Sequence, residues 1–270
     1  MPYTNKQQKE EIIARYIAGE SAYDLSRVFN ITNQSIYSLL SRRGIKRRPI
    51  RRLSCNESYF EKIDCEEKAY WLGFFFAEGS LVEKRYCLSI KLGKEEKEHL
   101  ERFKLAIKAD HSIKQTSDGR QAWVIKIGSK RLCRSLQKFG LGKGKALNLS
   151  WPDIPKIFIF DFIRGYLDGD GWITKWNDKK GYQLWSIGFA SCSKCFLKML
   201  QDNLNHLSGH KGGSLFSRTY KNPKWNDGHQ LTYGGNISVK RVGSILYKNA
   251  TIFLPRKKQI FDSFLLWYES

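Results

Sequence analysis

The chain has 270 residues, of which 41% are hydrophobic, enough for a packed core in one large domain plus a small one or in one duplicated domain. Its 47 basic and 26 acidic residues give a net charge of +21, which favours a polyanionic partner: nucleic acid first, an anionic membrane surface second. No apolar run approaches the roughly 20 residues that span a bilayer, and the first residues lack the apolar core of a signal peptide. Six scattered cysteines do not form a disulfide framework. We therefore expect a soluble intracellular protein.

Residues 6–43 are predicted to form three short helices, the second capped by Ser21 and the third by Thr32 or Asn33. Four apolar residues are spaced to form a small core: Ala22, Leu25, Val28 and Ile36. This arrangement, residues 1–46, resembles a helix-turn-helix whose third helix enters a major groove. The residues of that helix expected to contact DNA are Asn33, Gln34, Tyr37 and Arg42. The alternative is a helical bundle with a solvated face.

A strongly basic segment follows, with seven basic residues and no acid between positions 42 and 52. Charges at this density repel one another and cannot be buried, so residues 47–56 are predicted to form an extended linker. Such a segment can lie along phosphates or enter a minor groove. Its expected DNA contacts are Arg43, Lys46, Arg47, Arg48, Arg51 and Arg52. The alternative is a solvated linker or a targeting signal.

Two nine-residue stretches stand out in the rest of the chain, WLGFFFAEG at 71–79 and IRGYLDGDG at 163–171. Each places two small residues one helical turn apart on one face. These residues are Gly73 with Ala77 in the first stretch and Gly165 with Gly169 in the second. Two such helices can pack backbone against backbone.

Each stretch also carries an acid before its final glycine, Glu78 in the first and Asp170 in the second. A carboxylate is unfavourable in the last turn of a helix because it faces the negative end of the helix dipole. A bound cation is the simplest compensation. The two acids are therefore candidate metal ligands.

Aligned on their glycines, the two stretches resemble the paired motifs of single-chain LAGLIDADG homing endonucleases. Glu78 and Asp170 take the eighth position, which in that family holds the metal-binding catalytic acid. The first stretch departs at the sixth position, where Phe76 replaces the usual acid that Asp168 keeps in the second. The resemblance implies an α+β fold, a pseudo-twofold duplicated αββαββα saddle with repeats at 57–155 and 156–270, preceded here by the small all-α unit.

Strand patterns fit this fold independently. In the first repeat Tyr86, Leu88, Ile90 and Leu92 alternate with polar and basic residues. The resemblance turns the polar strand faces toward DNA, where lysine or arginine to guanine is the commonest base contact. The expected contacts are Lys91, Lys114 and Lys126 in the first repeat and Arg218, Tyr220 and Thr232 in the second. The alternative is that each simply solvates a strand face.

Two loops at equivalent places in the repeats carry basic residues, and the family keeps such a residue near its active site. Lys143 matches this position in the first repeat. In the second, Lys257 and Arg256 compete for it, and Lys257 is taken as the candidate. The alternative is a surface lysine in each loop.

By resemblance, the chain is expected to be a monomeric endonuclease that makes double-strand breaks in DNA at a long asymmetric target. Glu78 and Asp170 would hold Mg²⁺ or another divalent ion such as Mn²⁺. One alternative is a DNA- or RNA-binding relative that does not cleave, such as an intron maturase or a transcription regulator. Another is a glycosidase with paired carboxylates, which the net charge of +21 disfavours.

One further spacing is close to a zinc-finger pattern: Cys192, Cys195, His206 and His210. The segment between the second cysteine and the first histidine is predicted to be an amphipathic helix that the duplicated fold needs intact. We therefore favour a strand end leading into a core helix over a zinc site.

Overall fold

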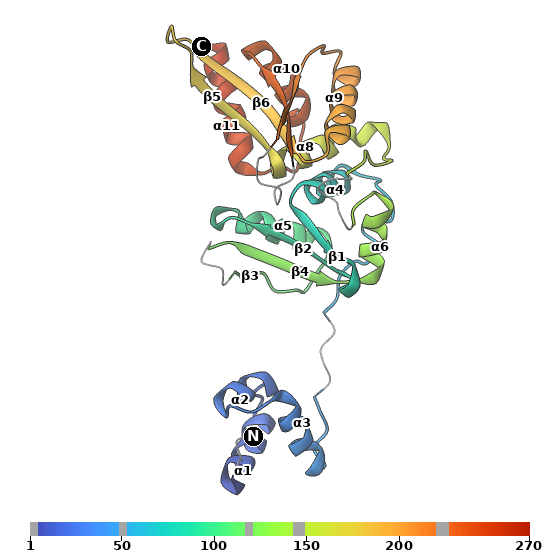
Figure 1. Cartoon of the computed structure of the whole chain (residues 1–270), viewed down its shortest axis with the longest axis vertical. Helices are drawn as coiled ribbons and strands as arrows, with labels where there is room; N and C mark the ends of the chain where they lie inside the picture. The colour runs from blue at the N-terminus through green and yellow to red at the C-terminus, as the bar shows by residue number, and fades with distance from the viewer. Residues whose placement is uncertain (1–4, 49–52, 117–120, 143–148, 220–226) are drawn as a thin grey trace. The chain divides into compact units, whose positions relative to one another are not determined.

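The structure, a computed structural model, describes residues 5–48, 53–116, 121–142, 149–219 and 227–270. The chain divides into two compact units, Met1–Arg52 and Leu53–Ser270, each with its own hydrophobic core (Figure 1). No helix among these described residues is long and apolar enough to cross a membrane.

The first unit contains α1 (Lys6–Ile17), α2 (Ala22–Val28) and α3 (Asn33–Arg42). Each helix begins at a side chain that accepts a backbone N–H from its first turn: Asn5, Ser21 and Thr32. The buried residues of its core are Ile12, Ile13, Tyr16, Ala22, Leu25, Ile36 and Leu40. The prediction was wrong for Val28, which is 58% exposed at the end of α2, because the next residue, Phe29, packs against the core instead.

The second unit is built from two copies of one element order. The first repeat contains α4 (Glu66–Glu78), β1 (Gly79–Val82), β2 (Cys87–Leu92), α5 (Lys97–Ala106), β3 (Lys114–Gln115), β4 (Trp123–Gly128) and α6 (Lys130–Lys138). The second contains α8 (Ile159–Asp170), β5 (Gly171–Asn177), β6 (Gln183–Ser191), α9 (Lys194–Ser208), β7 (Ser214–Arg218), β8 (Gly228–Gly234), α10 (Asn236–Tyr247) and α11 (Pro255–Glu269). The predicted α+β fold with a duplicated αββαββα order is confirmed, and the second repeat carries one helix more, α11.

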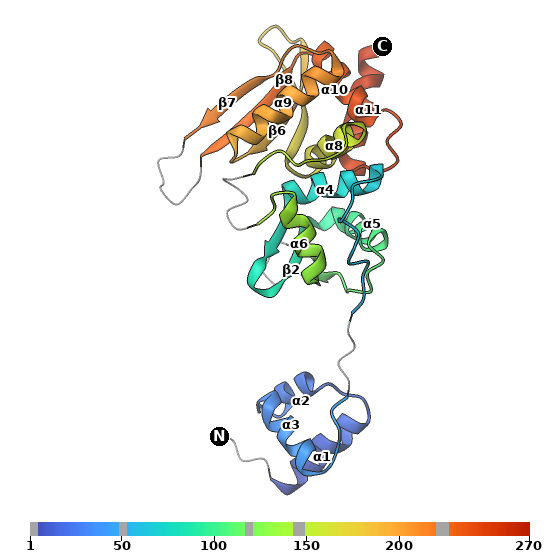
Figure 2. The same cartoon turned by 90° about the vertical axis from the view of Figure 1, so that its right-hand side faces the viewer.

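Each repeat forms a four-stranded antiparallel sheet, with strand order β1-β2-β4-β3 in the first and β5-β6-β8-β7 in the second. The strand registers match as well, since Gly79 pairs with Ile90 and Gly171 pairs with Phe189. Helices cover one face of each sheet (Figures 1 and 2). The two sheets are therefore equivalent position by position.

Alternate residues of each strand face the covering helices and enter one hydrophobic core shared by both repeats. In β2 these are Leu88, Ile90 and Leu92, as predicted. Tyr86, predicted to share their face, instead ends a short 3-10 turn with φ of 45° and is 38% exposed. The strand begins only at Cys87, because this left-handed residue turns the chain into it.

Helices α4 and α8 lie side by side between the two sheets and touch through their backbones (Figure 2). A Cβ atom on Gly73 would lie 1.9 Å from the carbonyl oxygen of Phe162, and one on Gly165 would lie 2.0 Å from that of Tyr70. One turn further along α8, a Cβ atom on Gly169 would lie 2.2 Å from the Cβ of Ala77. No larger residue fits at these glycines without moving a helix.

A buried arginine ties the outer end of this helix pair to the second repeat. Arg164 is only 2% exposed and donates to the carbonyl oxygens of Leu246 and Ile252, both at 2.9 Å. Its guanidinium also pairs with Glu66 of α4 at 2.7 Å, and the same carboxylate accepts the Thr251 hydroxyl at 2.8 Å. These contacts join α4 to the loop before α11, across the two repeats.

We expect Gly165→Ala to lower the free energy of unfolding by about 1–3 kcal/mol, the usual cost of overpacking a close contact. An alanine at an open helical position would instead be stabilising, because it reduces the entropy of the unfolded chain. Urea unfolding followed by circular dichroism measures the difference. Gly93→Ala is the matched control, since a Cβ atom there meets nothing within 4 Å, and equal stability of the two variants would contradict the backbone contact.

Candidate active centre and nucleic-acid interface

The acids of the two nine-residue stretches stand at the ends of the paired helices. Glu78 is the last residue of α4 and Asp170 the last residue of α8, and both are exposed. The Cγ atom of Glu78 lies 3.4 Å from the position that a Cβ atom on Gly169 would occupy. The helix interface therefore brings the Glu78 side chain alongside the final turn of α8, next to Asp170.

A third carboxylate, Asp168, is buried beneath this end of α8. It accepts hydrogen bonds from the hydroxyls of Tyr70 at 2.8 Å and Tyr247 at 2.9 Å and from the backbone N–H of Leu254 at 2.6 Å. Burial raises the pKa of Asp168, and these three donors act in the opposite direction. Because the donors come from α4, α10 and the start of α11, Asp168 links both repeats. In the first repeat Phe76 takes the equivalent position and is also buried.

Tyr70 is held on its other side by His99 of α5, whose Nε2 lies 2.9 Å from the tyrosine hydroxyl. The hydroxyl hydrogen goes to Asp168, so the ring donates through Nε2–H, which fixes its tautomer. Burial lowers the pKa of His99 to about 3, so this ring is neutral at pH 7. The sequence gave no local signal for this network, since its members lie far apart in the chain.

Lys257, predicted to act on the phosphate, is placed differently by the structure. Its side chain is buried, and its Nζ lies within hydrogen-bonding distance of four carbonyl oxygens at the end of α8. They belong to Leu167 at 2.6 Å, Asp168 at 2.8 Å, Gly169 at 3.3 Å and Gly171 at 2.6 Å. A positive charge here stabilises a helix C-terminus. Lys257 thus holds the turn that carries Asp170 and does not face solvent.

The other basic candidates of the two loops differ in what can be said of them. The guanidinium of Arg256 pairs with Glu96 at 2.8 Å, and its side chain is 56% exposed. Burial lowers the pKa of Lys257 to about 8, so at pH 7 its ammonium is still mostly charged. Lys143 lies outside the described residues.

The first sheet brings its three predicted lysines onto one face. Lys91 of β2 and Lys114 of β3 both pair with Val124 of β4, and Lys126 lies two residues further along the same strand. Residues two apart on a strand share a face, and the intervening Ile125 is buried. The lysines therefore form a basic cluster on the side of the sheet that faces away from the helices.

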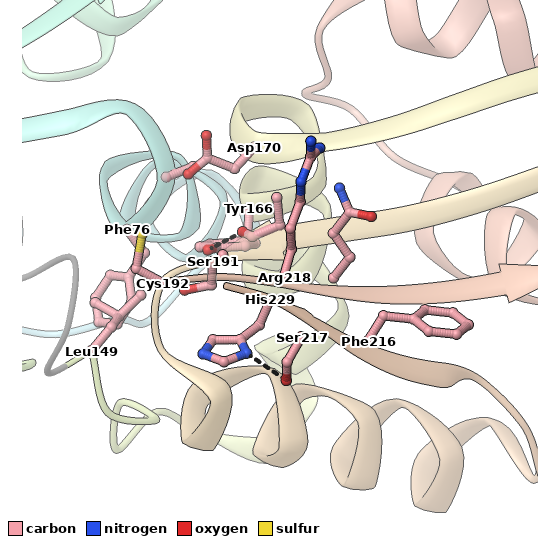
Figure 3. A pocket seen from close by; sticks show the side chains of 14 residues that line it. Phe76, Leu149, Tyr166, Asp170, Ser191, Cys192, Phe216, Ser217, Arg218 and His229 are labelled. Carbon is pink, nitrogen blue, oxygen red and sulfur yellow. Dashed lines mark hydrogen bonds between the residues drawn. The ribbon is translucent and has the colours of Figure 1, made fainter. Parts of the chain in front are cut away.

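The outer face of the second sheet borders a cavity of about 400 Å³ beside Asp170 (Figure 3). Arg218 of β7 lines it, together with Tyr166 and with His229, whose Nδ1 lies 2.9 Å from the Ser217 hydroxyl. The predicted residue Thr232 lies on the same outer face as Arg218, because both occupy alternate outward positions in the paired strands. Tyr220 lies outside the described residues. Tyr166 and His229 were not among the predicted site residues.

On the helical unit, Asn33 and Gln34 are exposed in the first turn of α3, and Arg42 and Lys46 are exposed at and beyond its end. Tyr37 is half-buried. Arg43 pairs with Glu10 of α1.

The basic segment does not extend from the helices at once, as the linker prediction required. Arg48 donates to the carbonyl oxygens of Gly19 at 2.6 Å and of Glu20, and its guanidinium lies 4.2 Å from the centre of the Tyr16 ring. Arg47 lies 4.4 Å from the Tyr37 ring centre. Both side chains fold back on the unit because tyrosine rings and free carbonyls offer them partners. Arg51 and Arg52 lie outside the described residues.

The zinc-finger spacing does not correspond to a metal site. Among the described residues, which include all four of these side chains, no three His, Cys, Asp or Glu groups gather to hold an ion. Cys195 and His206 lie on α9, and His210 is buried beside the Tyr233 ring. The favoured interpretation, a strand end leading into a core helix, describes α9.

Comparison with known proteins places this fold. Residues 158–246 match the profile of the LAGLIDADG-like domain. Solved LAGLIDADG homing endonucleases are similar in structure: I-LtrWI bound to target DNA (13% identity, 79% of this chain and 91% of that one, TM-score 0.51) and I-GzeII in complex with a DNA target (15%, 74% and 89%, 0.51). A point variant of I-SmaMI gives 14%, 75%, 92% and 0.51. No curated protein matches the chain. The predicted resemblance is confirmed at the level of the fold.

Replacing Lys257 by methionine should lower the free energy of unfolding by about 2 kcal/mol or more, because buried carbonyls would lose their donor. Lys258→Met is the matched control, since Lys258 makes only a partly exposed i,i+4 pair with Asp262 and should change stability by less than about 1 kcal/mol. Urea unfolding at pH 7 compares the two. Equal losses would show that Lys257 does not cap α8.

A pH series provides a second readout of the same variant. The folded pKa of Lys257 lies near 8, below its ordinary value of 10.5, so between these pH values the unfolded chain binds the proton that the folded chain has lost. Stability due to this group therefore rises with pH across that window and falls as pH drops through 8. Lys257→Met should lack this rise, which the Lys258→Met control should retain.

Proposed function

We propose that this protein is a site-specific endonuclease that hydrolyses phosphodiester bonds of double-stranded DNA with divalent metal ions. The observation that carries the proposal is the meeting of Glu78 and the Asp170 turn at the ends of α4 and α8. Each acid is followed directly by the first strand of a sheet, so the acids lie where the two sheets join. A DNA duplex lying across both sheets would present its backbone to them.

The residues present fit a hard divalent cation. Glu78 and Asp170 offer carboxylate oxygens, the ligands that Mg²⁺ prefers, and Mg²⁺ is commonly held by one or two carboxylates together with substrate phosphates and water. The described residues provide no closed cluster of three such ligands, which suits an ion completed by DNA. Bound there, the ion supplies Lewis-acid polarisation of the phosphate and a water of lowered pKa.

The remaining groups position this centre. Lys257 fixes the carbonyls of the turn that carries Asp170, and Asp168 with its tyrosine donors holds that turn against α4 and α10. In this way the chain orients its two carboxylates before substrate binds, which is the contribution that preorganised sites make to catalysis. Arg256, exposed at the start of α11, is the basic side chain of the second repeat that could reach a phosphate.

DNA binding is supported by charge and surface. The net charge of +21 suits a polyanion, the lysine cluster lies on an outer strand face, and I-LtrWI and I-GzeII, which share the fold, are described in complex with DNA. The helical unit adds a third contact region, with α3 as the candidate recognition helix. We propose a monomer, because one chain supplies both repeats.

The decisive test replaces each acid by its amide. Glu78→Gln and Asp170→Asn should each abolish Mg²⁺-dependent cleavage of duplex DNA while leaving the dissociation constant within a fewfold of the wild type, because the change removes metal ligation and little else. Cleavage of a randomised duplex library, followed by sequencing of the cut ends, measures activity. Asp202→Asn, an exposed acid paired with Lys198 on α9, is the control and should cut normally.

Two outcomes would change the proposal. Unimpaired cleavage by either amide variant would remove that acid from the active centre. Tight binding by the wild type with no cleavage in Mg²⁺ or Mn²⁺ would favour a relative that binds nucleic acid without cutting it.

The helical unit is tested through the salt dependence of binding. Each lost phosphate contact reduces the slope of log affinity against log salt by about 0.9, so the double variant Arg42→Gln with Lys46→Gln should lose about one to two units of slope. Its preferred cleavage site should remain the same. Lys104→Gln on α5 is a charge-matched control, and an unchanged slope for the double variant would exclude this end of α3 from the interface.

A further inference from the structure

The outer faces of the two sheets differ at matched positions. Strand register defines the equivalence: Gly79 pairs with Ile90, which pairs with Ile125, while Gly171 pairs with Phe189, which pairs with Leu231. Counting from these anchors gives three matched pairs: Lys91 with Ala190, Lys114 with Phe216, and Lys126 with Thr232. All three lysines of the first face are replaced by uncharged residues on the second.

Aromatic side chains are added to the second face. Trp172 matches Ser80 of the first sheet and lies over Gly188, where a Cβ atom would come within 2.3 Å of the indole ring. Trp176, two residues further along β5, is 45% exposed, and Phe216 is 59% exposed. These rings are held outward by the sheet and do not belong to the core.

Charge is sparse among the outward positions of β5–β8, all of which the structure describes. Arg218 is the only charged side chain there. Lys175 occupies an inward position, with its ammonium 5.6 Å from the Trp185 ring centre. The second face therefore cannot rely on several cationic contacts, as the first can.

In a major groove the two faces would recognise different groups. Lysine pairs with the N7 and O6 acceptors of guanine, whereas alanine, the threonine methyl and phenylalanine make apolar contact with the 5-methyl group of thymine. The residues that replace the three lysines, Ala190, Phe216 and Thr232, are of these apolar-contact types. Large exposed apolar groups on a proposed interface also point to an apolar partner surface.

Resting on the proposed function, we infer that the two halves of the target are read by different chemistry. The face of β5–β8 takes a thymine-rich half-site through contacts to thymine methyl groups, and the lysine face of β1–β4 takes a guanine-rich half-site. Continuity places both faces on one interface, since each sheet begins directly after a helix that ends in one of the two acids.

Replacing thymine by deoxyuridine in one half of a selected target tests this inference, because deoxyuridine lacks only the methyl group. Binding of the full chain should weaken by about fourfold for each contacted thymine, from the transfer free energy of one methylene. The effect should be confined to one half of the site. Fluorescence anisotropy in Ca²⁺, without cleavage, measures it.

Variants assign the effect to the second sheet. Trp176→Ser and Phe216→Ser, both at exposed positions, should bind the thymine and deoxyuridine targets more nearly equally than the wild type does. Leu266→Ser on α11, where Leu266 is 75% exposed on the helical side, is the control and should keep the full difference.

The outcomes separate this inference from the proposed function. Tight binding with equal affinity for thymine and deoxyuridine in both halves would overturn the inference and leave the endonuclease proposal standing. Sensitivity that persists in both serine variants would equally overturn the assignment to the second sheet. Failure of the wild type to select any duplex would overturn both.

Discussion

The second unit depends on a contact between two helix backbones. At Gly73 and Gly165 the facing carbonyl oxygens approach so closely that a single methyl group would overlap them. Such contact leaves no side chains between the helices to adjust, so the placement of α4 on α8 is set by main-chain geometry. Since β1 and β5 begin at the residues that follow these helices, the same contact sets the positions of both sheets and of both acids.

This arrangement brings two carboxylates to the negative ends of two helix dipoles, where they are unfavourable. The second repeat answers this with Lys257, whose ammonium lies on the terminal carbonyls of α8. Asp168, in the same turn, is held by hydroxyls from α4 and α10. Buried polar networks with satisfied partners are rigid, so the turn carrying Asp170 is fixed from below while its carboxylate remains at the surface.

The parts of this design that are local in sequence could be predicted. Helical spacing of Gly73 and Ala77 identified the packing face, and alternation identified the inward residues of β2, because each depends on neighbours within a few positions.

The parts that depend on distant residues could not be predicted. Lys257 has the same local sequence whether it faces solvent or meets carbonyls some 90 residues earlier. Arg164 and Arg48 are similar cases, since their partners are main-chain oxygens that only the folded chain brings near. Tyr86 adopts a positive φ that its residue type does not signal.

Duplication has preserved some positions and released others, and the division follows packing. Inward residues remain apolar in both copies, as Ile90 matches Phe189 and Ile125 matches Leu231, because the core admits nothing else. The acids remain acids, since both serve one centre. Outward strand positions have no such constraint from the fold, and there Lys114 faces Phe216 across the pseudo-twofold relation. A palindromic DNA would select the same side chain in both copies. Divergence confined to the outer faces is therefore what an asymmetric target imposes on a symmetric frame.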